Sequence, residues 1–261
     1  MIFPDRSIFP SLPAGLARIA FRRIFPASAL LLAACAASFS AGIPPSEKAC
    51  VILLHGLGRS RWSMWRMERF LSDHGYQTVN VGYPSTGADI RELVDSHVAP
   101  AVERCRQGFP ERIHFVTHSM GSILVRQYLQ DHRLPPGSRV VMLSPPNHGS
   151  ELADHLKEFP GYRWIMGPAG QELGTGPESI PNSLKPTGVE IGVITGDKCD
   201  NPAAWFVFEG PNDGRVSVES ARLPEMKDFR VVHASHAFIM MNTTVMEEVL
   251  FFLKKGRFRH L

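Results

Sequence analysis

A serine in a cramped turn is the first feature of this 261-residue sequence that could do chemistry. The apolar run RIHFVT (112–117) predicts a buried strand, and GSILVRQYL (121–129) predicts a helix directly after it. Ser119 stands between them, in Thr-His-Ser-Met-Gly. A strand, a tight turn with serine at its apex and a helix form a nucleophile elbow, which lifts the hydroxyl clear of the sheet. We therefore interpret Ser119 as a nucleophile; the alternative is a buried hydroxyl bonded to helix backbone.

A glycine motif, HGLG (55–58), follows the first apolar run of the chain. Glycines allow such a loop to approach a substrate oxygen closely, so that its backbone N–H groups can stabilise a negative oxygen. The N–H groups of Leu57 and of Met120, which follows the serine, are expected to form this oxyanion hole. His55 and Gly56 are expected to support the loop. Serine is a poor nucleophile at neutral pH, so the site also needs a histidine and an acid.

The elements around these motifs alternate between strand and helix. Apolar runs predict six strands, at 50–54, 76–82, 112–117, 139–144, 189–195 and 229–234. Helical spacing of apolar residues predicts helices at 61–75, at 90–105 with a bend or interruption at Pro100, at 120–132 and at 241–256. The pattern indicates an α/β fold, with a mostly parallel central sheet and helices on both faces.

One segment, at about 146–187, breaks this alternation. It is rich in glycine and proline and is long for a connection, so we expect a small cap or lid insertion within a single domain at 46–258. Its apolar and aromatic side chains could form a wall for an acyl chain, or could pack the cap onto the body of the domain. These residues are Phe159, Tyr162, Trp164, Ile165 and Met166.

Four motifs in order, VILLHGLG, THSMG, PNDGRVSVESA and SHAFIM, carry a resemblance to a known family. The sequence resembles the α/β-hydrolase fold, in its lipase/esterase-like branch, over roughly 48–256. The family order of serine, acid and histidine is reproduced. The family elbow usually begins with glycine, whereas this sequence has Thr117 there and Ser122 after Gly121. Because that position is crowded, a slight shift of the elbow is expected.

The resemblance implies the acid and the histidine. Asp213 lies in a segment similar to the Asp-Gly-x-Val segment that carries the acid in many lipases, although Asn-Asp-Gly could also be simple turn chemistry. Asp197 is the second choice, in a short run after the fifth strand that also contains Asp200. His236 is favoured as the base because a loop residue can reach across to Ser119. His233, at a strand end, is expected to be structural.

Two further histidines lie near the predicted site. His118 precedes the serine and is expected to be scaffolding. His148 follows the fourth strand and is expected to be a turn residue, with a place in the site wall as the alternative.

The first 35 residues are typical of a secretory signal. Three arginines precede a short apolar run, and Leu-Ala-Ala-Cys, ending at Cys35, resembles a bacterial lipobox. Residues 1–34 carry a net charge of +3, which is the whole formal charge of the chain, so charge gives no argument for nucleic acid as a partner. We expect an exported protein, either a lipoprotein of the bacterial cell envelope attached through Cys35 or a periplasmic or secreted form.

Export implies an oxidising compartment, in which cysteines can pair. The remaining cysteines are Cys50, Cys105 and Cys199, so at most one pair forms. Cys50 is expected to be a buried small hydrophobe, and Cys105 with Cys199 is the pair considered. The sequence shows no CxxC or Cys/His spacing for a metal, and the chemistry needs no cofactor.

The combined motifs predict a serine hydrolase that cleaves carboxylic esters, with a small-molecule ester or lipid as substrate. An acyltransferase, thioesterase or amidase would use the same three side chains. A binding protein of the envelope on the same fold is the non-catalytic alternative, disfavoured because a binding module needs no such constellation in register.

Overall fold

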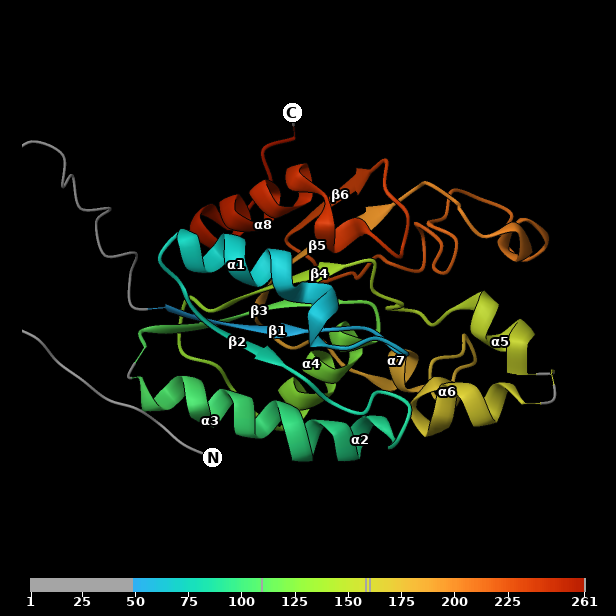
Figure 1. Ribbon diagram of the computed structural model, residues 1–261, viewed down its shortest axis with the longest axis horizontal. Coiled ribbons are helices and arrows are strands. Elements are labelled where there is room, and N and C mark those ends of the chain that lie inside the picture. The colour runs from blue at the N-terminus through green and yellow to red at the C-terminus, as the bar shows by residue number, and fades with distance from the viewer. Residues whose placement is uncertain (1–48, 109, 158, 160, 261) are drawn as a thin grey trace, which may run out of the picture. The chain divides into compact units, whose positions relative to one another are not determined.

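The computed structural model of the chain describes residues 49–108, 110–157, 159 and 161–260 (Figure 1). The expected signal segment 1–35 with Cys35, and the start of the expected domain at residue 46, lie outside the described residues. The signal, the lipid anchor and the boundaries of the domain and its insertion stay predictions.

A parallel sheet of six strands forms the centre of the described chain (Figure 1). In order across the sheet, the strands are β2 (Gln77–Val81), β1 (Ala49–Leu54), β3 (Arg112–His118), β4 (Arg139–Leu143), β5 (Glu190–Gly196) and β6 (Asp228–Val232). The six predicted strands and the predicted α/β class are confirmed. The chain reverses its direction of travel across the sheet between β1 and β3, and ligands of such sheets bind outside the carboxyl ends of the strands at this switch point.

Helices cover both faces of the sheet because its strands are apolar on both faces. All six residues of β1 are buried. Ile52 and Leu54 pack in one hydrophobic core, and Val51 and Leu53 in the other. The first core includes residues of α2 (Ile90–Leu93), α3 (Ala99–Gln107) and α4 (Met120–Asp131). The second includes residues of α1 (Trp65–Asp73) and α8 (Thr243–Lys255), on the opposite face in Figure 1.

The helix expected at 90–105 is interrupted as its proline predicts. A π-helical stretch, η2 (Val94–Val98), joins α2 to α3, and Pro100 stands at the start of α3. Proline has no N–H to donate to the carbonyl four residues earlier, so a regular α-helical ladder cannot run through this point.

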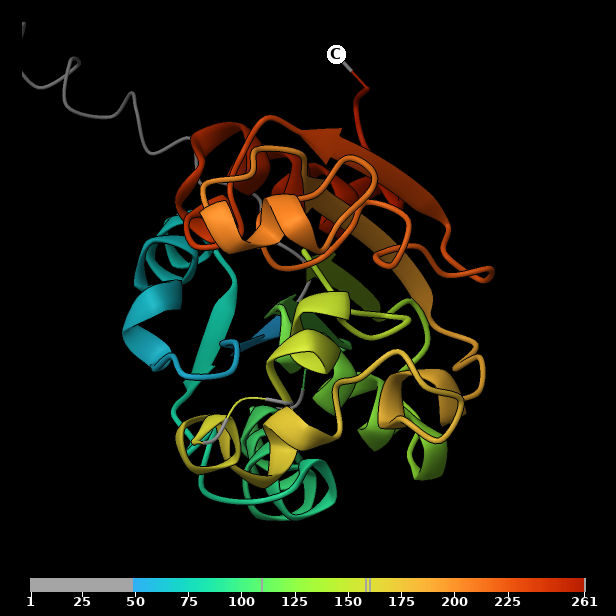
Figure 2. The ribbon, with the colours of Figure 1, turned by 90° about the vertical axis from the view of Figure 1, so that its right-hand side faces the viewer.

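The segment between β4 and β5 carries three short helices, α5 (Glu151–Lys157), α6 (Tyr162–Gln171) and α7 (Ile180–Ser183). Short 3₁₀ helices occupy η1 (Arg61–Met64), η3 (Pro202–Phe206) and η4 (Ile239–Met241). Figure 2 looks onto the carboxyl ends of the strands, where the yellow segment with α5 and α6 and the orange segment with η3 both lie toward the viewer. Among the described helices, none combines the length and apolar character needed to cross a membrane.

The cysteine pairing differs from the expectation. Cys50 of β1 and Cys105 of α3 form a disulfide, with their Cα atoms 5.8 Å apart, and Cys199 is free. The interpretation of Cys50 as a simple hydrophobe and of Cys105 with Cys199 as the pair was therefore wrong. The reason is that α3 lies across β1, which brings together two cysteines 55 residues apart in sequence.

Removal of this disulfide is expected to lower the free energy of unfolding. Closing a loop of this length restricts the unfolded chain, and the stabilisation is roughly 2–4 kcal/mol. Urea denaturation of residues 36–261 with both Cys50 and Cys105 replaced by alanine measures the loss. Cys199→Ser is the control and should unfold like the parent. Equal midpoints for all three proteins would contradict the assigned pairing.

Candidate active site

Ser119 lies in a strained turn between β3 and α4. Its backbone has φ 53° and ψ −125°, a left-handed region that non-glycine residues seldom occupy. The Ser119 N–H donates to the carbonyl of Leu143 (2.9 Å). A Cβ at Gly121 would lie 2.8 Å from two carbonyl oxygens at the end of β1, so only glycine allows α4 to start this close.

Thr117, at the position where the family elbow usually has glycine, finds a partner in the first turn of α4. Thr117 Oγ1 and Ser122 Oγ form a hydrogen bond of 2.8 Å, and both side chains are fully buried. The threonine is accommodated by the serine five residues later, which the sequence shows directly after the elbow.

Asp213 and His236 form a buried pair. His236 Nδ1 and Asp213 Oδ2 are 2.8 Å apart, and the His236 backbone N–H donates to the Asp213 carbonyl (3.0 Å). The other carboxylate oxygen accepts from the N–H groups of Arg215 and Val216. Burial raises the pKa of the Asp213 carboxyl, but the charge and hydrogen bond of His236 and the other bonds it accepts outweigh burial and place the pKa below its ordinary value. This carboxylate stays ionised.

The second-choice acid and histidine also meet, but away from this site. His233 Nδ1 and Asp197 Oδ1 are 3.0 Å apart. Their side chains are 77% and 39% exposed, against 7% and 0% for His236 and Asp213. Neither lines the cavity that contains Ser119. Asp200 is also exposed, near Gly214.

The HGLG loop is held by a tyrosine that the sequence analysis missed. Tyr83, just after β2, stacks on the His55 ring with centroids 3.9 Å apart, and its hydroxyl donates to the His55 carbonyl. The Tyr83 N–H donates to His55 Nε2, so the proton is on Nδ1, which donates to the Gly56 carbonyl. Burial lowers the pKa of His55, which is consistent with a neutral ring. Its position just after the end of a predicted strand could have indicated that Tyr83 lies near the site.

Gly56 brings the loop against the nucleophile. A Cβ there would lie 3.0 Å from both Ser119 Cβ and His118 Nδ1. No described residue accepts a hydrogen bond from the N–H of Leu57 or of Met120, which leaves both groups free for a ligand.

His118 is a buried neighbour of His236. Its Nε2 donates to the His236 carbonyl (2.9 Å), and the two ring centroids are 4.8 Å apart. Burial, and next the charge of His236, hold the pKa of His118 well below its usual range. A neutral ring therefore supports the backbone of His236.

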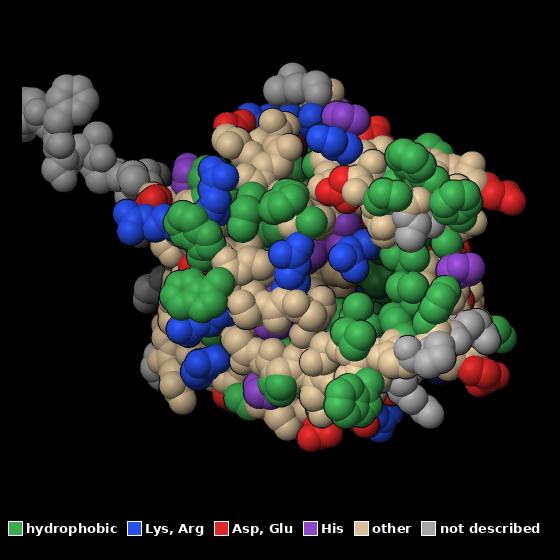
Figure 3. All heavy atoms as spheres, turned by 45° about the vertical axis from the view of Figure 1, so that its right-hand side comes forward, with side chains coloured by type: hydrophobic (Ala, Val, Ile, Leu, Met, Phe, Trp, Pro, Cys, Tyr) green, Lys and Arg blue, Asp and Glu red, His purple; other side chains and the backbone are tan. Residues whose placement is uncertain are grey.

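A cavity of about 350 Å³ joins these residues at the carboxyl edge of the sheet. Ser119, His118 and His236 line it, together with Leu57 and Gly58 of the glycine loop. Figure 3 shows this face, with histidine and basic side chains around the hollow. Its remaining lining residues are Arg59, Pro146, Ser150, Leu152, Ala153, Leu156, Tyr162, Met166, Leu173, Arg215 and Val216.

Of the apolar and aromatic residues selected in the 146–187 segment, some line the cavity and others do not. Tyr162 and Met166, one turn apart on α6, face the cavity. Phe159, Trp164 and Ile165 are exposed and do not line it. Leu152 and Leu156 of α5, which the sequence analysis did not select, supply more of the apolar wall.

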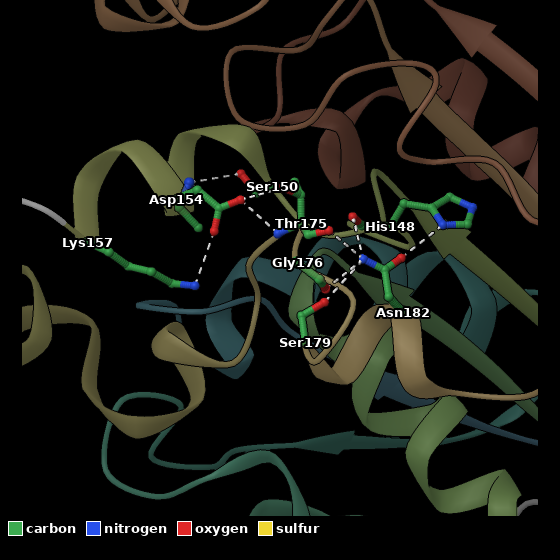
Figure 4. Close-up of polar contacts among 9 residues, drawn as sticks. His148, Ser150, Asp154, Lys157, Thr175, Gly176, Ser179 and Asn182 are labelled. Carbon is green, nitrogen blue, oxygen red and sulfur yellow. Dashed lines mark hydrogen bonds and ion pairs between the residues drawn. The ribbon is translucent and has the colours of Figure 1, made fainter.

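Polar contacts join parts of the 146–187 segment that lie far apart in sequence (Figure 4). Asp154 Oδ2 accepts from the Thr175 N–H (2.7 Å) and hydroxyl (2.6 Å). Asn182 Nδ2 donates to the Thr175 carbonyl (2.9 Å), and Asn182 Oδ1 accepts from His148 Nδ1 (3.1 Å). His148 is therefore a turn residue, as expected, and not part of the cavity wall.

Arg59 and Arg215 also line the cavity and were missed by the sequence analysis. Both neighbour motif residues, since Arg59 follows HGLG directly and Arg215 lies two residues after Asp213. In the described ranges, no group of three or more His, Cys, Asp or Glu residues is arranged to hold a metal ion.

The fold agrees with the comparisons with known proteins. The Alpha/beta hydrolase family matches residues 51–243, and the chain belongs to this family. A comparison with curated proteins finds no match.

Solved structures share the fold. The mature form of the Bacillus licheniformis lipase BlEst2 has a TM-score of 0.65 at 20% identity, over 80% of this chain and 94% of that chain. The Pyrococcus furiosus esterase PF2001 has a TM-score of 0.54 at 19% identity, over 81% and 83%. Phospholipase PlaB from Legionella pneumophila has a TM-score of 0.54 at 21% identity, over 67% of this chain and 45% of that chain.

Disruption of the Thr117–Ser122 hydrogen bond is expected to destabilise the elbow. Thr117→Val leaves a buried serine hydroxyl unpaired, and Ser122→Ala leaves the threonine hydroxyl unpaired, at a cost of about 1–3 kcal/mol each. The double variant removes both polar groups, so its loss should be smaller than the sum. Free energies of unfolding from urea titrations of the four proteins give the coupling, and strictly additive losses would contradict it.

Proposed function

We propose that this chain is a serine hydrolase that cleaves carboxylic esters. The observation that carries the proposal is that Ser119, at the apex of a strained elbow, shares one cavity with His236, whose other ring nitrogen is bonded to a buried, ionised Asp213. This arrangement combines a nucleophile, a base within the same cavity and a carboxylate that orients the base.

The reaction would proceed through an acyl-enzyme. Because Asp213 occupies Nδ1 of His236, Nε2 is left to take the proton of Ser119 as its Oγ bonds to the carbonyl carbon. The leaving alcohol then takes that proton as the ester bond breaks. Water attacks the acyl-enzyme in the same way, with His236 as base, and the acid is released as Oγ regains its proton.

Leu57 and Met120 are proposed as the oxyanion donors. The close approach of Gly56 to Ser119 brings the loop beside the nucleophile, and Met120 starts the helix behind it. One such donor contributes on the order of 2.7–4 kcal/mol to transition-state stabilisation. His55 and Tyr83 would act by holding the loop.

Ester chemistry is favoured by two further observations. Part of the cavity wall is apolar, with Leu152 and Leu156 from α5 and Met166 from α6, as an acyl chain requires. The proteins that share the fold are described as a lipase, an esterase and a phospholipase.

Labelling with a fluorophosphonate probe tests the nucleophile and the base. In protein comprising residues 36–261, we expect phosphorus to bond to Ser119 Oγ with loss of fluoride, and peptide mapping to find the adduct there. His236→Ala should slow labelling by about a hundredfold or more, because proton transfer contributes roughly 10²–10⁴ to the rate.

The second acid–histidine pair supplies matched controls. His233→Ala and Asp197→Asn should label at the parent rate, whereas Asp213→Asn should label slowly. An adduct on another residue, or folded protein that does not react, would overturn the assignment.

We further propose export and lipidation at Cys35. The buried Cys50–Cys105 disulfide supports export, since such bonds persist in oxidising compartments. The full chain expressed in a bacterial host should incorporate radiolabelled palmitate and fractionate with membranes. Cys35→Ser should abolish incorporation, and equal labelling of both proteins would refute the lipidation.

A further inference from the structure

Two arginines share the cavity with the nucleophile. Arg59 belongs to the turn that follows Leu57, and its N–H donates to the Gly56 carbonyl (3.2 Å). Arg215 follows Asp213 by two residues, and its N–H donates to the Asp213 carboxylate (3.0 Å). The Arg59 side chain therefore starts from the glycine loop, and the Arg215 side chain starts from backbone bonded to Asp213.

In the ranges that the structure describes, neither the Arg59 nor the Arg215 guanidinium forms an ion pair, and no acidic residue lines the cavity. Arg59 Nη2 donates to the Ala237 carbonyl (3.1 Å), next to His236, which holds the side chain beside the loop that carries the histidine. Guanidinium has five N–H donors, so most of those of Arg59 remain available.

The two positive charges also act on each other. Both side chains line the same cavity, and burial, and next the charge of Arg215, lower the pKa of Arg59. Two like charges without a counter-ion repel, and an anion between them would relieve the repulsion. Guanidinium groups suit carboxylate and phosphate because they can bind two oxygens at once.

Part of the cavity wall is apolar, with Leu152, Leu156 and Met166 from the segment between β4 and β5. A ligand that fills the whole cavity therefore combines an apolar chain with a negative group. Figure 3 shows basic side chains beside the hollow and hydrophobic side chains on the other side of it.

We propose that Arg59 and Arg215 form an anion subsite, so that the preferred esters carry a carboxylate or phosphate in addition to an acyl chain. The inference rests on the proposed function and names its substrate class. The anionic group could belong to a soluble ester or to a lipid headgroup, and the experiment separates these sources.

Selectivity between matched esters is the first measurement. A 4-nitrophenyl ester with a terminal carboxylate is compared with its methyl-capped, neutral counterpart at low ionic strength. The kcat/KM ratio, anionic over neutral, should fall about threefold in Arg59→Gln and in Arg215→Gln and about tenfold in the double variant. Arg66→Gln, an exposed arginine of α1, removes the same charge away from the cavity and should leave the ratio unchanged.

The lipid source is tested in a second arm. A lysophosphatidic acid is compared with the monoacylglycerol of the same chain in detergent micelles. A preference in this arm that the double variant loses assigns the subsite to lipid headgroups, and one confined to the nitrophenyl pair assigns it to soluble carboxylates. Either result supports the subsite. Ratios in both arms that the double variant leaves unchanged, or that Arg66→Gln lowers equally, overturn it.

Binding without turnover separates failure of the subsite from failure of the hydrolase. In Ser119→Ala protein, inorganic phosphate should raise the Tm above that in chloride of equal ionic strength, and the triple variant with Arg59→Gln and Arg215→Gln should lose this rise. If phosphate stabilises Ser119→Ala protein through the two arginines but the parent protein cleaves no ester, the subsite stands and the hydrolase is rejected. Ester cleavage without stabilisation or charge preference would reject only the subsite.

Discussion

The left-handed backbone of Ser119 is the constraint on which the rest of the site depends. A residue in that conformation costs on the order of 1–3 kcal/mol and persists only where its surroundings determine it. Here β3 and α4 fix both sides of the turn, and the Leu143 carbonyl accepts the Ser119 N–H. Gly121 permits the helix to start against β1, and Gly56 permits the loop after β1 to reach the serine. The same close packing of the two loops thus both permits and maintains the strained backbone of Ser119.

The imidazoles around the site have different hydrogen-bond partners and therefore different proposed roles. His118 and His55 are buried without a carboxylate, and burial lowers the pKa of each, so they serve as neutral hydrogen-bonding supports. His236 is bonded to Asp213 through both its ring and its backbone, and its carbonyl is held by His118. Of these three histidines, only His236 is bonded to a carboxylate, which is the partner that the proposed base needs.

The sequence predicted what local pattern determines. Apolar runs identified all six strands, and the strand–turn–helix context identified the turn at Ser119 despite Thr117. The pairing of Cys50 with Cys105 could not be predicted, because it follows from the packing of α3 on β1 and not from any local sequence pattern. The choice between Asp213 and Asp197 rested on resemblance, because each aspartate has a histidine nearby in space and burial, which distinguishes the pairs, arises only from packing.

The burial of the disulfide also determines when, relative to folding, its two cysteines can be oxidised. Cys50 lies on a strand flanked by β2 and β3, and neither sulfur is exposed. A thiol oxidant can reach these atoms only before the sheet closes around them, so the bond must form while the chain is still open. For the same reason a reductant acts only on molecules that have opened, and the rate at which the bond is lost would measure how often the centre of the sheet, next to the glycine loop, comes apart.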